Sequence, residues 1–305
     1  MKLLYIGVNK ENLEKYYPSY IKGEFLKDTY TEDELVNVVI GKNINVLMVD
    51  VFRTTFTMSL LQKLKGHIKL INCLYQYIES LIDLKEAESC GIEVKKLPDN
   101  IYCNEVDEFA ITQLLCACKG TIPFNKSIKN GEWNQAVNTN LSLGGKTLGV
   151  VGYGNIGKYI VKLCENWGFN IVVTRKHLNK NQVAPNVTFV EFSDLIENSD
   201  YIIFAVPLNK DTFQMFNENH IEKLKKNAII VNISRGNIVD ENAIHKALRL
   251  GKLYKYCTDV FSREPINKDH VFLNSDKTIL SPHVAWATED TFKKAYDVWF
   301  YQTNL

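Results

Sequence analysis

The sequence predicts an α/β protein with two doubly wound parallel-sheet domains. The first observation is an alternation of short apolar runs with amphipathic segments, which starts at the N-terminus and starts again near residue 145. The second is the break between these two series at Pro98, Asp99 and Asn100. The third is the length of 305 residues, which is enough for two domains.

The first hundred residues contain four predicted strands and three predicted helices. Runs of apolar and β-branched residues place the strands at residues 3–6, 46–50, 68–73 and 92–95. Helical periodicity places the helices near residues 31–40, 57–65 and 83–90. Residues 106–118 then form one long apolar helix, of the kind that joins or braces two domains.

The second series is longer and its first strands are more strongly apolar. It predicts six strands, at residues 147–152, 171–174, 201–206, 228–233, 256–260 and 278–280. Helices are predicted between them near residues 156–167, 193–198, 218–225 and 240–250. Strands joined by helical crossovers predict a doubly wound sheet.

Composition excludes several classes of protein. The chain has 36 Lys and Arg against 35 Asp and Glu, so it lacks the basic field of a nucleic-acid-binding protein. No apolar run approaches the ~18 residues of a membrane span and the N-terminus has no signal-peptide pattern, so we expect a cytoplasmic protein. The seven cysteines are scattered and never spaced C-x-x-C, so neither a metal site nor a disulfide framework is expected.

A glycine-rich turn follows the strand predicted at residues 147–152. Gly152, Gly154 and Gly157 form the pattern G-x-G-x-x-G between that strand and an amphipathic helix. The first glycine permits a tight turn, the second lets the backbone approach a pyrophosphate, and the third lets the helix pack on the strand. This pattern predicts a Rossmann dinucleotide-binding domain.

The end of the next strand bears on the choice of cofactor. A NAD site usually carries an acidic residue there, to accept hydrogen bonds from the adenosine ribose. This strand instead ends in Thr174, Arg175 and Lys176, followed by His177. Cationic side chains pair well with a 2′-phosphate, so the sequence favours NADP(H). NAD(H) stays open, because the segment could also be a solvated basic loop.

Three later segments share order and spacing with a known family. They are residues 232–241 (NISRGNIVDE), 259–265 (DVFSREP) and 281–288 (SPHVAWAT). Together with the glycine turn they resemble the D-isomer-specific 2-hydroxyacid dehydrogenases, and the resemblance extends over roughly residues 100–290. It implies a dinucleotide-binding domain of residues 102–283 and a smaller, discontinuous, flavodoxin-like substrate domain of residues 1–101 and 284–305, with the active site in the cleft between them.

The resemblance also implies three catalytic residues. His283 would be the general acid in reduction and the general base in oxidation, Glu264 would bind its other ring nitrogen, and Arg235 would hold the substrate carboxylate. These residue types suit hydride addition to a 2-oxo acid, because negative charge builds on the carbonyl oxygen. Singly, each could be structural: a helix cap, a turn carboxylate, or the end of a strand.

Further cofactor contacts are implied in the same way. Asp259 would meet the nicotinamide carboxamide, and Ile233 and Ser234 would pass under its ring. Four other residues would contact the nicotinamide ribose or the pyrophosphate: Val206, Pro207, Asn155 and Ile156, with Thr212 nearby.

The substrate loop departs from the family, because residues 73–83 contain no glycine. Tyr75, Gln76 and Tyr77 would have to turn aside or enter the pocket, which favours a small acid such as glyoxylate or hydroxypyruvate. Alternatively, these tyrosines pack between the domains. Trp286 resembles the residue found in glycerate dehydrogenase and in hydroxypyruvate or glyoxylate reductases.

Two other functions stay open at this point. Phosphite dehydrogenase and NAD-dependent 2-hydroxyacid dehydrogenases share the architecture, whereas Glu264 argues against formate dehydrogenase, which we expect to pair its histidine with glutamine. A non-catalytic, dinucleotide-sensing protein of the corepressor type would also retain the three residues. Finally, the helix at residues 106–118 and the loop around Trp133 are more apolar than one domain core needs, so we expect a homodimer.

Overall fold

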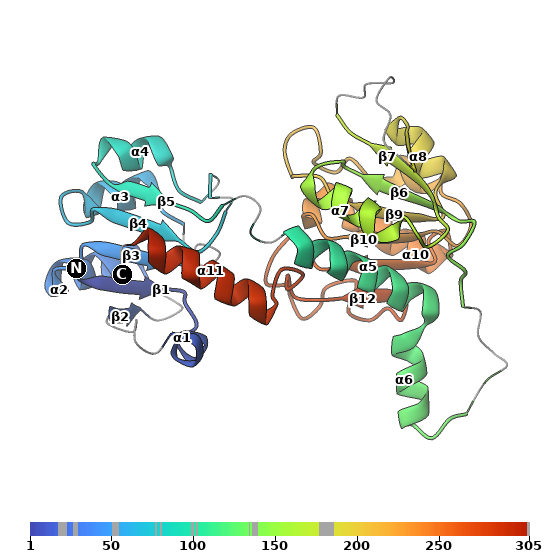
Figure 1. Ribbon diagram of the computed structural model, residues 1–305, viewed down its shortest axis with the longest axis horizontal. Coiled ribbons are helices and arrows are strands. Elements are labelled where there is room, and N and C mark those ends of the chain that lie inside the picture. The colour runs from blue at the N-terminus through green and yellow to red at the C-terminus, as the bar shows by residue number, and fades with distance from the viewer. Residues whose placement is uncertain are drawn as a thin grey trace. The chain divides into compact units, whose positions relative to one another are not determined.

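A computed structural model describes residues 1–17, 23–26, 30–50, 55–76, 78–79, 81–98, 101, 103–133, 135, 140–176 and 186–303 (Figure 1). The chain divides into two compact units. The first contains Met1–Ile101 and Thr288–Leu305, and the second contains Tyr102–Ala287. Each unit has its own parallel sheet, which confirms the predicted fold class.

The sheet of the first unit has five strands in the order β2-β1-β3-β4-β5, and all neighbouring strands run parallel. This is the flavodoxin-like order. The strands are β1 (Leu3–Ile6), β2 (Gly23–Leu26), β3 (Val46–Val49), β4 (Leu70–Cys73) and β5 (Glu93–Lys95). The prediction of four strands missed a fifth, β2, a four-residue edge strand of sequence GEFL in which no residue is fully buried.

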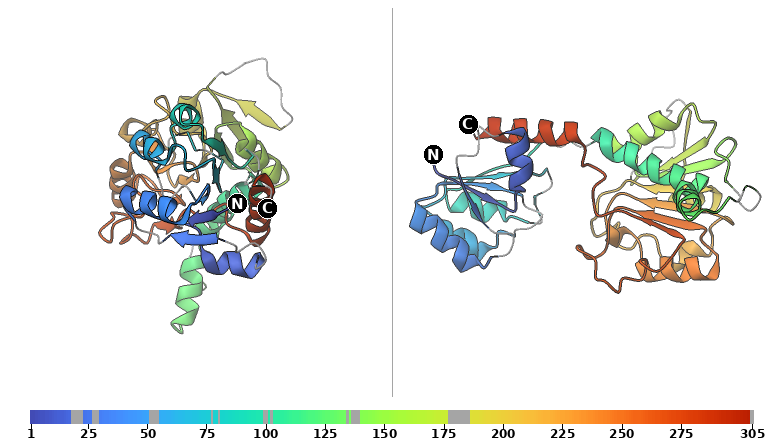
Figure 2. Two further views of the ribbon diagram at one scale, coloured as in Figure 1. Left: turned by 90° about the vertical axis from the view of Figure 1, so that its left-hand side faces the viewer. Right: turned by 90° about the horizontal axis from the view of Figure 1, so that it is seen from below.

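Helices cover both faces of this sheet (Figure 2). They are α1 (Lys10–Tyr16), α2 (Glu32–Lys42), α3 (Met58–Leu64), α4 (Leu84–Ser89) and α11 (Glu289–Gln302). The C-terminal helix α11 is part of this unit because Trp299 is fully buried there. Its indole N–H donates to the Asn72 carbonyl at 2.9 Å, and the Asn72 side chain donates to the Trp299 carbonyl at 2.8 Å.

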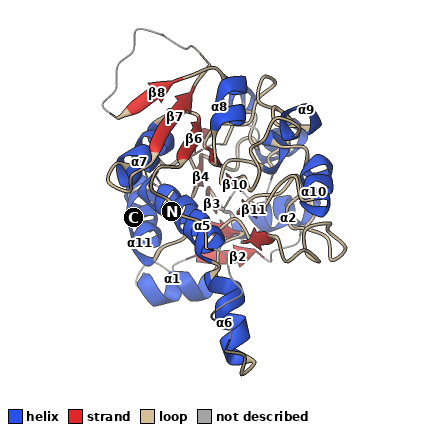
Figure 3. Cartoon of the chain, turned by 90° about the vertical axis from the view of Figure 1, so that its right-hand side faces the viewer, coloured by secondary structure: helices blue, strands red, loops and turns tan. Residues whose placement is uncertain are grey.

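The sheet of the second unit has seven parallel strands in the order β12-β11-β10-β9-β6-β7-β8. Figure 3 shows β8, β7 and β6 side by side. The strands are β6 (Thr147–Val151), β7 (Asn170–Thr174), β8 (Val187–Phe189), β9 (Tyr201–Phe204), β10 (Ile229–Asn232), β11 (Lys255–Thr258) and β12 (Thr278–Leu280). Strand β8, which the sequence did not predict, has only three residues and none is fully buried. The strand order reverses between β6 and β9, the place where doubly wound sheets bind nucleotides.

Two apolar clusters cover the two faces of the seven-stranded sheet. One packs against α5 (Cys103–Lys119) and α7 (Asn155–Cys164), and the other against α8 (Phe192–Asn198) and α10 (Glu241–Leu250). Two shorter helices complete the unit, α9 (Glu218–Ile221) and the 3₁₀ helix η3 (Gly236–Ile238).

A separate helix, α6 (Thr121–Lys129), follows α5 and projects away from the sheet of its unit (Figure 1). The sequence predicted only a loop here. The left-handed Gly120 (φ 60°) ends the long helix, and Pro123 lies in the first turn of α6, where a missing N–H is tolerated.

The chain returns to the first unit at Thr288, whereas the sequence analysis placed this crossing at Val284. The four intervening residues stay with the second unit because the N–H groups of Val284 and Ala285 donate to the carboxylate of Asp259. Within the described part of the chain, no helix is long and apolar enough to span a membrane.

Candidate active site

The glycine turn between β6 and α7 has the close packing that the sequence pattern predicts. Gly152 has a φ of 104°, in the region that disfavours side chains. A Cβ atom on Gly157 would lie 1.9 Å from the Gly152 carbonyl oxygen, so only glycine fits. Among the described atoms, none lies within 4 Å of a Cβ built on Gly154. The turn is therefore tight on its protein side and open where a ligand approaches.

The basic segment at the end of β7 is only partly described. Thr174 is buried and its carbonyl accepts the Gly152 N–H at 2.9 Å, which ties the segment to the glycine turn. Arg175 is half-buried and Lys176 is exposed. Lys176 Nζ lies 2.5 Å from Asp211 Oδ2, so its charge is matched by a carboxylate from the loop after β9. His177 lies outside the described residues.

The ends of β9 and β10 are joined by Ser234. Its hydroxyl donates to the Phe204 carbonyl at 2.8 Å and accepts the Val206 N–H at 3.0 Å. Ile233 and Ser234 are buried, and Pro207 is held by Thr212, whose hydroxyl donates to its carbonyl at 2.6 Å. These residues form the edge of the sheet beside the glycine turn.

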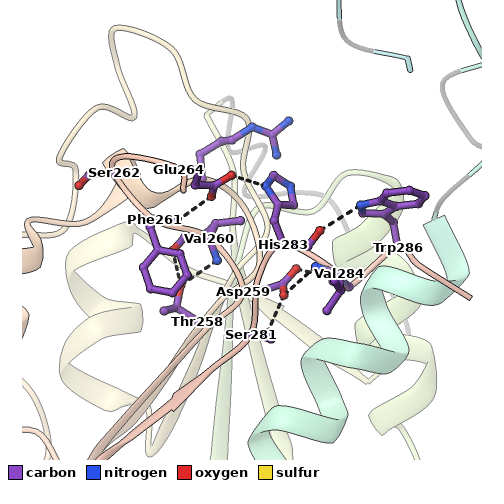
Figure 4. Close-up of polar contacts among 12 residues, drawn as sticks. Thr258, Asp259, Val260, Phe261, Ser262, Glu264, Ser281, His283, Val284 and Trp286 are labelled. Atoms are coloured by element: carbon purple, nitrogen blue, oxygen red, sulfur yellow. Dashed lines mark hydrogen bonds and ion pairs between the residues drawn. The ribbon is translucent and has the colours of Figure 1, made fainter. Parts of the chain in front are cut away.

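The predicted pair of His283 and Glu264 is in contact (Figure 4). His283 Nδ1 lies 2.7 Å from Glu264 Oε2, and the other oxygen of Glu264 accepts the Phe261 N–H at 2.8 Å. Burial alone would raise the pKa of Glu264, but the His283 hydrogen bond and charge, the Phe261 N–H and the Arg235 charge together lower it. An ionised Glu264 assigns the ring proton of His283 to Nδ1.

Arg235 follows β10 directly and is half-buried. Its Nη1 donates to the Ser234 carbonyl at 2.7 Å, and its carbonyl accepts the Asn232 side-chain N–H at 3.0 Å. Because Arg235, Glu264 and His283 follow the carboxyl ends of β10, β11 and β12, the topology brings all three to the edge of the sheet that carries the glycine turn.

Asp259 is 1% exposed and is the centre of the turn that carries His283. One carboxylate oxygen accepts the Ser281 hydroxyl at 2.5 Å and the Val284 N–H at 3.0 Å, and the other accepts the Ala285 N–H at 2.8 Å. The His283 N–H donates to the Asp259 carbonyl at 2.8 Å. These contacts position His283, and the contact of Asp259 with a nicotinamide carboxamide stays a prediction.

The sequence analysis missed Gln113 on α5. Its side-chain N–H donates to the Ser281 hydroxyl at 2.9 Å, which extends the hydrogen-bond chain from Asp259. The available signal was a glutamine among the mostly apolar residues 110–118 of this helix, because a buried amide needs partners.

The predicted substrate residues belong to different units. Tyr75 and Gln76, at 8% and 7% exposure, are buried in the first unit, and Tyr77 lies outside the described residues. Trp286 belongs to the second unit, where its indole N–H donates to the His283 carbonyl at 3.1 Å (Figure 4). Trp286 is thus joined to the turn of His283.

Comparisons with known proteins identify the family to which the second unit is similar. The family model described as D-isomer specific 2-hydroxyacid dehydrogenase, NAD binding domain, matches residues 111–285, more than half of the chain. A glyoxylate reductase of Korarchaeum cryptofilum is 33% identical over 218 residues, which are 69% of this chain and 64% of that protein. A D-3-phosphoglycerate dehydrogenase of Methanocaldococcus jannaschii is 36% identical over 217 residues, 70% of this chain and 41% of that protein.

The chain therefore belongs to the D-isomer-specific 2-hydroxyacid dehydrogenase family, and the resemblance found in the sequence is confirmed. Among solved structures, the D-lactate dehydrogenase of Escherichia coli has a TM-score of 0.86 at 22% identity, with 100% of this chain and 96% of that chain covered. A D-2-hydroxyisocaproate dehydrogenase has a TM-score of 0.84 at 22% identity, with coverage of 100% and 98%. These two structures share the fold.

Proposed function

We propose that this chain reduces small 2-oxo acids to D-2-hydroxy acids, with glyoxylate or hydroxypyruvate as substrate and NADP(H) as the preferred cofactor. The observation that carries the proposal is the 2.7 Å contact between His283 and Glu264 at the sheet edge that carries the glycine turn. Family membership supports the reaction class, and relatives such as the Korarchaeum protein, named glyoxylate reductase, support a small substrate.

The residues of the glycine turn fit a dinucleotide. The space beside Gly154 is open, and α7 starts without a side-chain cap among the described residues, so the first N–H groups of α7 are left for an anionic ligand. Asn155 and Ile156, the first two residues of this helix, would hold the pyrophosphate by their backbone. The bound cofactor supplies a hydride to the carbonyl carbon of the substrate.

The three polar residues then divide the remaining chemistry. Arg235 holds the substrate carboxylate and orients the carbonyl group toward His283. Protonated His283 donates its Nε2 proton to the carbonyl oxygen as negative charge develops there. Glu264 stays ionised through the reaction and fixes the ring by accepting the hydrogen bond from Nδ1–H, while that proton stays on the histidine.

One observation favours NAD(H) as an alternative cofactor. Asp211 already pairs with Lys176, so a 2′-phosphate would have to compete with this carboxylate for the ammonium group. Removing the carboxylate in Asp211→Asn frees Lys176 and should raise the preference for NADPH over NADH. Dissociation constants of both cofactors, measured by quenching of tryptophan fluorescence, give this preference without turnover.

The first experiment follows the loss of reduced-nicotinamide absorbance with NADPH and with NADH. The 2-oxo acids are glyoxylate, hydroxypyruvate, pyruvate and a bulky aromatic acid, and phosphite is tested with the oxidised cofactors. We expect glyoxylate or hydroxypyruvate with NADPH to give the highest kcat/KM. Turnover of phosphite alone would overturn the assignment in favour of phosphite oxidation.

His283→Ala should lower kcat about 10²- to 10⁴-fold, the usual contribution of a general acid, and leave the dissociation constant of NADPH unchanged. His67→Ala, at an exposed position in the first unit, is the matched control and should behave as wild type. If both cofactors bind but no acid is reduced, the chain is a dinucleotide sensor and the proposed reaction is wrong.

We also propose that the protein is a homodimer formed through its second unit. Two helices of this unit carry exposed apolar side chains: α6 carries Ile122 (52%) and Ile128 (54%), and α7 carries Tyr159 (41%) and Leu163 (40%). Trp133, after α6, is 79% exposed. No side chain of α6 is fully buried and Phe124 is only partly covered, so Ile122 and Ile128 stay largely exposed. A second copy of the same helix would cover them.

A further inference from the structure

The turn that carries Glu264 is held by a second glutamate. Glu241, the first residue of α10, has a side chain that is only 12% exposed. Its Oε1 accepts the backbone N–H of Ser262 at 2.9 Å, and its Oε2 accepts the Ser262 hydroxyl at 2.5 Å. Both hydrogen-bond donors of Ser262 therefore bind the Glu241 carboxylate. Ser262 lies two residues before Glu264.

His270 supports this carboxylate from the other side. Its Nε2 lies 3.5 Å from Glu241 Oε2, and its side chain is 14% exposed. The Phe272 N–H points at His270 Nδ1 at 3.4 Å, which assigns the ring proton to Nε2, facing Glu241. The ring also packs edge-on against Phe261, with 5.4 Å between the centroids, so the same histidine contacts the residue before Ser262.

The peptide bond between Phe261 and Ser262 also touches the segment that carries Arg235. A Cβ atom on Gly236 would lie 1.9 Å from the Phe261 carbonyl carbon and 2.1 Å from the Ser262 nitrogen. This peptide is thus packed against Gly236 while Glu241 binds its N–H. A shift of Ser262 would move Glu264 relative to both Arg235 and His283.

The Glu264 turn needs such an anchor because the Glu264 side chain itself is 34% exposed. A 2.7 Å contact between Glu264 and His283 survives only small displacements of the turn. Hydrogen bonds to a carboxylate are short and strong, and two on one residue fix orientation as well as position.

We propose that Glu241 is a positioning residue for the Glu264–His283 pair, acting through Ser262 and oriented by His270. It has no role in binding the dinucleotide. The inference rests on the proposed function, because it gives Glu241 a positioning role in the reaction proposed for that same site.

The test compares Glu241→Ala and Glu241→Gln in the full chain. Glu241→Ala should lower kcat about 10- to 100-fold, the effect of a misplaced catalytic group, with the KM for NADPH within twofold of wild type. Glutamine keeps an oxygen for the Ser262 N–H, so it should restore most of kcat. Glu218→Ala is the matched control, because Glu218 also starts a helix and pairs with Lys246, but 60% of its side chain is exposed.

A second measurement does not depend on turnover. The proton shared by His283 Nδ1 and Glu264 should give a far-downfield ¹H resonance, assigned by its loss in His283→Ala. Glu241→Ala should weaken or shift this resonance, and Glu218→Ala should leave it in place. If Glu241→Ala does not fold, Ser262→Ala removes only the hydroxyl and should lower kcat a few-fold with the same change in the resonance.

Wild-type kcat and an unshifted resonance in Glu241→Ala would overturn the inference, and so would a raised KM for NADPH at unchanged kcat. These results are distinct from failure of the proposed function. In that case the wild-type protein itself would reduce no 2-oxo acid, whatever Glu241→Ala does to the resonance.

Discussion

His283 has a left-handed backbone conformation, with a φ of 56°, that only a few per cent of non-glycine residues adopt. The surrounding contacts impose it, because the N–H groups of His283, Val284 and Ala285 all donate to Asp259. Such strain is held where the fold over-determines a residue, and it aims the imidazole at Glu264. The geometry of the site is thus set by a buried aspartate that need not touch a reactant.

Asp107 on α5 is a second buried acid, but one with a poorly satisfied side chain. It is 2% exposed, and its Oδ1 has no hydrogen-bond partner among the described residues. Burial raises its pKa from 3.8 to about 6. The folded protein therefore binds this proton more tightly than the unfolded chain, so folding gains stability as the pH falls from above 6 toward 3.8.

Asp107→Asn should stabilise the protein at neutral pH, because the ionised carboxylate is disfavoured in its buried site. The rise of the Asp107 pKa from 3.8 to about 6 corresponds to an increase in the free energy of unfolding of roughly 3 kcal/mol at most in the variant. The gain should be largest above pH 7 and should vanish near pH 4, where the wild-type carboxyl is protonated when folded. Urea unfolding at both pH values measures it, and an equal gain at both would contradict the raised pKa.

At the scale of elements, the sequence predicts the central strands and misses two of the four edge strands that the structure describes. Strands β1, β3 and β4 are wholly buried, so each appears in the sequence as a short run of apolar residues, which Asn72 interrupts in β4. Strands β2 and β8 lie at sheet edges, pack on fewer neighbours and carry weak patterns. Helix α6 escaped prediction for a related reason, since none of its side chains is buried.

The candidate site follows the same logic. Arg235, Glu264 and His283 could be predicted because each lies in a local motif at a strand end. The contacts of Glu241 with Ser262 could not, because they join residues 21 apart that only the packing of α10 against the following strand and loop brings together. The contact of His270 with Glu241 depends on the same tertiary packing.

The end of β7 carries the test of cofactor choice. Arg175→Asp should lower kcat/KM for NADPH relative to NADH about 10- to 100-fold, because it removes charge-assisted bonds to a 2′-phosphate and adds repulsion. Arg249→Asp, an exposed position near the end of α10, is the control and should leave the ratio unchanged. An unchanged ratio in Arg175→Asp would show that this segment does not determine the cofactor preference.

At the scale of the whole molecule, the proposed dimer predicts a change of mass. Ile128→Lys places a charge on the exposed apolar face of α6 and should shift the protein from dimer to monomer in sedimentation equilibrium. Met58→Lys, at a similar exposure of 53% in the first unit, should leave the dimer intact. A wild-type protein with the mass of one chain would refute the dimer directly.

The two crossings of the chain between its units set an order of events during synthesis. Residues 1–101 leave the ribosome first, but α11, which buries Trp299 against Asn72, is made last. The second unit is one continuous segment, so it has all its strands before the first unit has all its helices. The part of the protein that is translated first is therefore the part that is completed last, and until then the face of its sheet that receives α11 stays uncovered.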